Sequence, residues 1–339
     1  RDQPRSRGLG DVYKRQLGAN TLAGTVNLVR KAPVRESFAD LRIGAGSHET
    51  YEAKFDGAAY SEKYRAALRL NGIYLEPSTL RDGIDHEWGA LNPAMVWDVS
   101  EKASIRIDAD FQYSDVTPDA GLPVRDSRLV KSSRSATFQE LDDFSEQDVV
   151  RLLGTIRFEP RDGLMLRNKT YYNRLDWDSR GTVFAGFFFA AAGLEPVPTT
   201  LSRFRPTLDD EQEILGNELE LMVQADTGPV AHDLLFGVEV LRFTDEFIIE
   251  IPPGADINVD TGLRAPSPFL GPLPTNAGDA ETDMFGVYAL DGFRLDTRWA
   301  GLAGVRIDWL DFEDRVRGTR RSDSEFSPFG GLTLSLIHI

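Results

Sequence analysis

Residues 103–114, ASIRIDADFQYS, decide the fold that we expect for this chain. Apolar or aromatic side chains stand at every odd position of this stretch, and polar or charged side chains stand at every even position. Alternate side chains of a strand point to opposite faces of a sheet, so the stretch predicts a strand with one apolar and one charged face. Residues 299–309, WAGLAGVRIDW, repeat the pattern with a tryptophan at each end of the apolar row. Aromatic residues at both ends of such a row are typical of strands that cross a membrane.

The same period of two recurs along the chain and predicts about twelve strands. They are expected near 38–47, 50–59, 63–76, 87–99, 103–116, 148–159, 163–178, 207–225, 230–250, 281–295, 298–312 and 325–335. Short turns alternate with long connections, which are expected near 77–86, 117–147, 179–206, 251–280 and 313–324. Short turns at one end of a sheet and long loops at the other end are typical of outer-membrane barrels.

Composition excludes several classes of function. The formal net charge is -16, with 54 acidic against 38 basic residues, which argues against a nucleic-acid partner. The chain has no cysteine, and its four histidines are scattered, so the sequence offers no metal-ligand cluster. The longest apolar run, residues 183–194, has twelve residues, too few for a membrane-spanning helix. No arrangement of residues suggests catalysis, so we do not expect an enzyme.

Residues 17–33, LGANTLAGTVNLVRKAP, resemble the end of the plug domain of TonB-dependent outer-membrane receptors. In that family a glycine-rich turn, a short strand and a proline lead into the first barrel strand. Later stretches, such as residues 37–56 and ETDMFGVYALDGFRL at 281–295, are similar to barrel strands of the siderophore-receptor subgroup. The resemblance implies an all-β fold, a transmembrane antiparallel β-barrel preceded by the last strand of a plug. About 12 of an expected 22 strands are present on this interpretation.

The resemblance and the composition divide the chain into four expected regions. Residues 1–16 are basic and are expected to be a non-native leader, and residues 335–339 are expected to be a similar tail. Residues 17–33 are the expected end of the plug, and residues 34–334 are the expected partial barrel. We therefore expect an internal fragment that is inactive alone, because strands that cannot close leave two unpaired edges in the membrane.

The resemblance also implies a function. It implies an outer-membrane receptor of a Gram-negative bacterium that takes up a ferric siderophore by TonB-energised transport. The implied partners are the ferric siderophore, the TonB-ExbB-ExbD complex, and outer-membrane lipid and lipopolysaccharide. Iron arrives already bound to the siderophore, so no cofactor and no metal site of the protein's own is expected. Two alternatives stay open: the same architecture importing cobalamin, haem or an oligosaccharide, or a secreted β-rich binding module.

A large, partly apolar chelate favours aromatic and arginine side chains at the barrel mouth. Six candidates stand near the strand ends that adjoin long loops: Arg81, Trp88, Tyr113, Tyr172, Trp177 and Arg180. The competing interpretation is that each is a girdle or packing residue.

Two further features lie in or beside the long loops. The apolar stretch VFAGFFFAAAG, residues 183–193, suggests a wall over the ligand, a loop folded against the barrel mouth or an interaction patch. The acidic clusters at 142–143 and 209–211 are expected to form a solvated face, bridged by divalent ions to lipopolysaccharide, rather than a catalytic pair.

Overall fold

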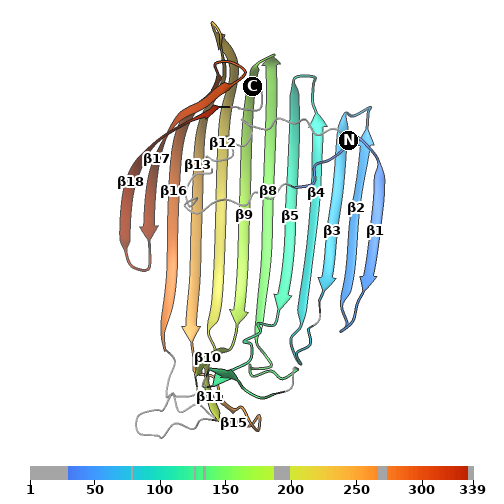
Figure 1. Ribbon diagram of the computed structural model, residues 1–339, viewed down its shortest axis with the longest axis vertical. Coiled ribbons are helices and arrows are strands. Elements are labelled where there is room, and N and C mark those ends of the chain that lie inside the picture. The colour runs from blue at the N-terminus through green and yellow to red at the C-terminus, as the bar shows by residue number, and fades with distance from the viewer. Residues whose placement is uncertain are drawn as a thin grey trace.

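Twelve long strands form one antiparallel sheet in the computed structural model, which describes residues 30–77, 79–125, 127–132, 135–186, 199–265 and 273–334. Each long strand pairs with the long strands before and after it in the chain, so the sheet is a continuous meander (Figure 1). Its members are β1 (Phe38–Ala45), β2 (Tyr51–Ser61), β3 (Ala66–Glu76), β4 (His86–Asp98), β5 (Ala103–Val116), β8 (Phe144–Arg161), β9 (Leu164–Arg180), β12 (Thr207–Thr227), β13 (Val230–Ile251), β16 (Leu273–Arg294), β17 (Trp299–Asp314) and β18 (Thr319–Leu334). The twelve predicted strands and their antiparallel order are confirmed.

Six short strands lie in the long connections. They are β6 (Val124–Arg125), β7 (Arg128–Leu129), β10 (Val183–Gly186), β11 (Thr200–Phe204), β14 (Asp256–Asn258) and β15 (Arg264–Ala265). The described residues contain no helix long and apolar enough to cross a membrane. The expected leader at 1–16, residues 17–29 of the expected plug end and the expected tail at 335–339 lie outside the described residues.

Long connections gather at one end of the sheet, the lower end in Figure 1, and we call this the loop end. They span residues 77–85, 117–143, 181–206 and 252–272, close to the predicted positions. The long connection expected at 313–324 is wrong, because β17 and β18 are joined by a tight turn with Gly318 at a φ of 63°. The start of β18 is polar on both faces, so the alternation that marks the other strands is missing there.

The two faces of the sheet differ as the alternation predicts. Ile107 is 48% exposed, whereas its neighbour Asp108 is 2% exposed and accepts a hydrogen bond from Arg106 at 2.7 Å. Directly opposed residues of antiparallel strands share a face. The register therefore shows which residues of the other strands share a face with Ile107 or with Asp108. We call the face that carries Ile107 the apolar face and the face that carries Asp108 the polar face.

The apolar face becomes acidic near the loop end. Two neighbouring levels of the sheet each carry a carboxylate on five consecutive strands. We call this group the acidic belt; it consists of Glu87, Asp115, Glu146, Asp148, Asp176, Asp178, Asp209, Glu211, Glu246 and Asp279. Charged residues continue on this face for one or two further levels of β9, β12, β13 and β16, at Arg174, Glu213, Arg242 and Asp283. Ionised side chains are costly in hydrocarbon, so the belt lies outside the apolar band.

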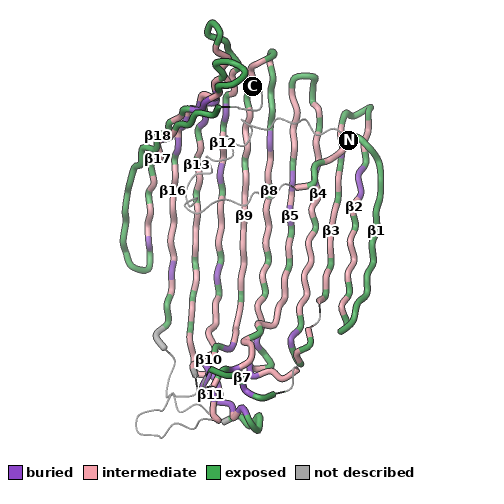
Figure 2. The backbone as a smooth tube through the Cα atoms, in the orientation of Figure 1, coloured by how far each residue is buried: buried purple, intermediate pink, exposed green. Residues whose placement is uncertain are grey.

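Both edges of the sheet are unpaired within the described residues. Figure 2 shows β1 and β18 exposed along nearly their whole length, whereas the central strands are mostly half-buried. These edges are where a complete barrel wall would continue.

Candidate ligand-binding site at the loop end of the sheet

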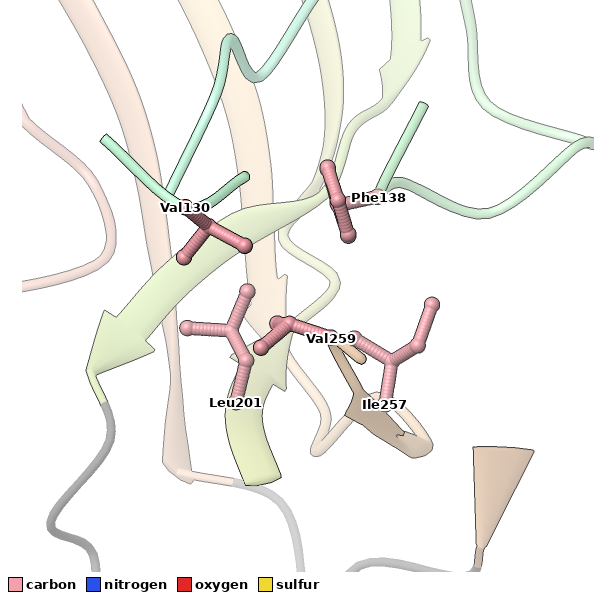
Figure 3. Packing of buried hydrophobic residues seen from close by; sticks show 5 residues of the cluster. All are labelled: Val130, Phe138, Leu201, Ile257 and Val259. Carbon is pink, nitrogen blue, oxygen red and sulfur yellow. The ribbon is translucent and has the colours of Figure 1, made fainter. Parts of the chain in front are cut away.

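Three long connections fold together at the loop end into one small unit, which we call the loop cap. It comprises the described parts of residues 117–143, 181–206 and 252–265. Strands β10, β11, β14 and β15 form a separate four-stranded sheet within it. One buried apolar cluster joins the three connections (Figure 3): Val130, Phe138, Leu201, Ile257 and Val259. The long connections are therefore packed against one another rather than extended separately into solvent.

Arg203 of β11 is the polar centre of the loop cap. Its side chain is 0% exposed and pairs with the carboxylate of Glu140. It also donates hydrogen bonds to the backbone oxygens of Phe138, at 2.8 Å, and Ala255, at 2.7 Å. Burial lowers the pKa of Arg203, and the neighbouring Glu140 carboxylate opposes this effect. One guanidinium thus holds residues from all three connections together.

The base of the loop cap carries a second group of ion pairs. Arg205 donates to Asp142 at 2.7 Å and to Asp143 at 3.1 Å, and Arg180 donates to the Asp142 carboxylate at 3.0 Å. Burial would raise the pKa of Asp142, but the charges of Arg205 and Arg180 outweigh it and hold that pKa below its usual value. Asp143 is buried and accepts a hydrogen bond from the Thr182 amide, so the expected solvated face is wrong for Asp143.

Arg81 connects two of the long connections. Its Nε atom lies 3.1 Å from Asp119 Oδ2, and the Asp82 amide donates to the backbone oxygen of Ser135 at 2.9 Å. The connection between β3 and β4 is thereby tied to the loop cap. Ile84 of the same connection is also buried.

Trp88 and Trp177 lie in one row on the polar face. Trp88 is directly opposite Ser114 of β5, which is opposite Gln147 of β8, which is opposite Trp177 of β9. Three strand spacings of about 4.8 Å place the two tryptophans roughly 14 Å apart across the sheet. Trp177 Nε1 donates to Ser145 Oγ at 2.9 Å, which fixes the indole beside β8.

Tyr113, Tyr172 and Arg180 lie on the other face. Tyr113 and Tyr172 belong to the apolar rows of β5 and β9, and the Tyr172 hydroxyl donates to Glu213 at 2.7 Å. Arg180 lies in the same row of β9 and stacks over the Phe144 ring, 5.3 Å from its centroid. The structure therefore places Trp88 and Trp177 in one row of the polar face, whereas the two tyrosines lie on the apolar face, where girdle aromatics are expected.

A charged network on the polar face was missed by the sequence analysis. Arg167 pairs with Glu220, and Arg306 pairs with Glu239 at 2.7 Å. The Tyr288 hydroxyl donates to Glu218 at 2.6 Å, and its ring covers Gly237. Each strand shows charges on alternate positions, but the register that pairs them is not visible in one strand's sequence.

The acidic cluster at 209–211 is split between the two faces. Asp209 and Glu211 are exposed on the apolar face, as expected for a solvated surface, whereas Asp210 is buried on the polar face opposite Trp177. Among the described residues, no three carboxylate or histidine side chains come together in a way that would hold a metal ion. Of the apolar stretch 183–193, residues 187–193 lie outside the described residues, whereas Phe184 packs against the core of the loop cap.

Comparison with known proteins supports the same architecture. The metal-pseudopaline receptor CntO of Pseudomonas aeruginosa (strain UCBPP-PA14) is 27% identical over 317 residues, which cover 91% of this chain and 43% of that protein. The probable TonB-dependent siderophore receptor PiuA of Acinetobacter baumannii is 22% identical, with 89% of this chain and 44% of that protein covered. The chain thus spans less than half the length of these curated relatives.

Solved structures show the same fold. The crystal structure of the ferripyoverdine receptor of the outer membrane of Pseudomonas aeruginosa, bound to ferripyoverdine, matches with a TM-score of 0.77 at 16% identity, covering 92% of this chain and 42% of that one. The siderophore receptor PiuA from Acinetobacter baumannii matches with a TM-score of 0.73 at 16% identity, covering 93% of this chain and 49% of that one.

The model of the family described as TonB dependent receptor-like, beta-barrel, matches residues 96–337, which include eight of the twelve long strands and the loop cap. Membership of this family displaces the alternative of a secreted β-rich binding module. This chain belongs to the TonB-dependent receptors of the outer membrane, and it contains part of their β-barrel.

Proposed function

We propose that the chain forms part of the wall of a receptor that takes up a ferric siderophore across the outer membrane. The observation that carries the proposal is the row containing Trp88 and Trp177, which faces the polar side of the sheet next to the loop cap. Aromatic faces give a large chelate a wide contact area, and the packed loops supply a preformed boundary. The names of the relatives, several of them siderophore receptors, support the same class of ligand.

The proposed cycle is binding followed by energised release, with no covalent step. The iron is cargo and arrives fully coordinated by the siderophore, so the protein need not supply metal ligands. The TonB-ExbB-ExbD complex is the proposed source of energy and would act through the plug.

We further propose that residues 17–33 end this plug. Their described part lies against the polar face: Lys31 Nζ donates to Asp56 at 2.7 Å, and Arg69 donates to the Ala32 backbone oxygen at 2.8 Å. Arg30 reaches to 4.0 Å from Asp110 on β5. The chain therefore approaches β1 along the side of the sheet that a plug would occupy.

The acidic belt supports the proposed contact with lipopolysaccharide. It lies on the apolar face just beyond the band that lipid would cover. Divalent cations would bridge its carboxylates to lipopolysaccharide phosphates, since both partners are anionic.

A second candidate ligand is favoured by one relative's name. The metal-pseudopaline receptor binds a metal chelate whose metal the name leaves open. We therefore include chelates of other metals among the ligands to be tested, together with cobalamin, haem and oligosaccharides.

Uptake in cells tests the proposal. The gene for the intact receptor would be expressed in a Gram-negative strain that lacks its own siderophore receptors, with and without a functional TonB. Uptake of radioactive iron from at least one class of siderophore, lost without TonB, is the expected result. TonB-dependent uptake of cobalamin, haem or an oligosaccharide in its place would overturn the assignment of the ligand, and uptake of none of these would overturn the proposal.

A further inference from the structure

Asp210 and Asp245 form a carboxylate pair on the polar face near the loop end. Asp210 of β12 is directly opposite Trp177, and Asp245 of β13 lies one level farther from the loops. The two residues therefore occupy diagonal positions of neighbouring strands on one face of the sheet. Asp210 is 6% exposed, whereas Asp245 and Trp177 are half-buried.

Each carboxylate keeps one oxygen without a partner. The Oδ1 atoms of Asp210 and Asp245 are buried and have no hydrogen-bond partner among the described residues. Gln212 Nε2 donates to the other oxygen of Asp210 at 3.0 Å. The neighbours on the polar face at these two levels of β9, β13 and β16 carry no charge: Leu175, Trp177, Phe247, Gly278 and Ala280.

Other carboxylates on the polar face have cationic partners. Asp108 pairs with Arg106 at 2.7 Å, Asp110 lies 3.2 Å from Arg151, and Glu220 pairs with Arg167. A buried carboxylate without a counterion is costly, and two side by side are more so. Among the described residues, the Asp210–Asp245 pair therefore lacks the positive charge that these other carboxylates receive.

We propose that Asp210 and Asp245 bind a cationic organic group, an ammonium or a guanidinium, carried by a molecule that enters at the loop end. A guanidinium presents a fork of donors that matches two carboxylates. Trp177 adds an aromatic face beside the pair, and its one polar atom is already bonded to Ser145. A divalent metal fits less well, because it would require several more oxygen ligands and no third carboxylate or histidine joins the pair among the described residues.

The inference rests on the proposed function in one respect, since it takes the polar face at the loop end as the side that ligands reach. It adds that a positively charged group on the ligand is recognised. It can fail while uptake of a ferric siderophore holds, and cation binding can be measured without any siderophore.

Calorimetric titration of the intact receptor in detergent micelles tests the inference. The probes are butylguanidinium and its uncharged analogue butylurea, which have nearly the same shape. We expect saturable binding of butylguanidinium and at least about tenfold weaker binding of butylurea, because hydrogen bonds to an ionised partner are the stronger ones. The D210N and D245N variants should each weaken butylguanidinium binding by about tenfold. Asp209→Asn is the matched control, since it removes a neighbouring carboxylate on the opposite face.

Asparagine nearly preserves the shape of aspartate and removes the repulsion, so the D210N and D245N variants should melt at or above the temperature of the unaltered receptor. Lower melting temperatures in both variants would show that the carboxylates are structural and overturn the inference. Equal binding of the two probes, undiminished binding in D245N or absence of saturable binding would also overturn it. Displacement of butylguanidinium by micromolar Ca²⁺ or Mn²⁺ would assign the pair to a metal instead.

Discussion

Arg203 of β11 and Glu140 of the connection before β8 form an ion pair at the centre of the loop cap, with the arginine side chain wholly buried. Removing one partner of a buried pair leaves the other charge uncompensated, which costs on the order of 3–5 kcal/mol. The same guanidinium satisfies two backbone oxygens from other parts of the cap. The order of the loops therefore depends on a single side chain as well as on the apolar cluster.

We expect Arg203→Met to unfold the loop cap while leaving the sheet intact. Trypsin should cut the variant within residues 117–143 much faster than the unaltered receptor, and the heat-modifiable shift on gels should persist. The control is Arg242→Gln, which breaks an exposed ion pair with Asp283, a kind of pair that contributes little to stability. Equal resistance to trypsin in R203M and the unaltered receptor would show that the cap does not depend on Arg203.

The face of the sheet on which each candidate residue lies should decide whether it contributes to ligand binding. Trp88→Ala and Trp177→Ala should each weaken binding of the proposed ligand, a ferric siderophore, by about tenfold or more, because aromatic anchors that become buried dominate such contacts. Tyr113→Ala and Tyr172→Ala lie on the apolar face and should leave affinity unchanged. Fluorescence titration of the four variants checks this expectation, and loss of binding in the tyrosine variants alone would reverse the assignment of faces.

Acid should loosen the base of the loop cap. The pKa of Asp142 is held below its usual value in the folded protein, so its ionised form stabilises the fold. That contribution is fully present above the usual aspartate pKa near 4 and is lost as the pH falls through the lowered value. The protection factors of the Arg180 and Arg205 amides against hydrogen exchange, measured relative to the intrinsic rate at each pH, should fall on acidification, and Asp142→Asn should remove that part of the pH dependence.

Gly237 should not accept a side chain. A Cβ atom there would lie 2.0 Å from Cζ of Tyr288, so alanine would displace the ring from its bond with Glu218. We expect Gly237→Ala to destabilise the fold by about 1–3 kcal/mol, as overpacking does. Gly331→Ala on the edge strand β18 is the control, because nothing lies within 4 Å of its added Cβ. In thermal melts, Gly237→Ala should unfold at a lower temperature than Gly331→Ala.

Alternation along single strands was enough to predict the sheet. The alternation at residues 103–114 and 299–309 predicts which side chains share a face, and the structure confirms the prediction for both stretches. The alternation failed where both faces are polar, as at residues 319–324, because such strands lie beyond the apolar band and show no contrast.

The site was less accessible to sequence reasoning because it depends on register between strands far apart in the chain. Trp88 and Tyr113 were both predicted to contact the ligand because each stands near a long loop. In the structure Trp88 lies on the polar face and Tyr113 lies on the apolar face. The pairing of Asp210 with Asp245 likewise requires the offset between β12 and β13. The packing of Arg203 among three connections has no local signature at all.

The unbroken register of β12 and β13 limits how this protein can evolve. All 21 residues of β12 are opposed to residues of β13, and the irregularities in the neighbouring ladders fall at strand ends, near Phe158 and Ile249. Inserting or deleting one residue within such a strand would exchange every later side chain between lipid and lumen. Changes of length are therefore expected in the loops, whereas the wall is expected to change by substitution.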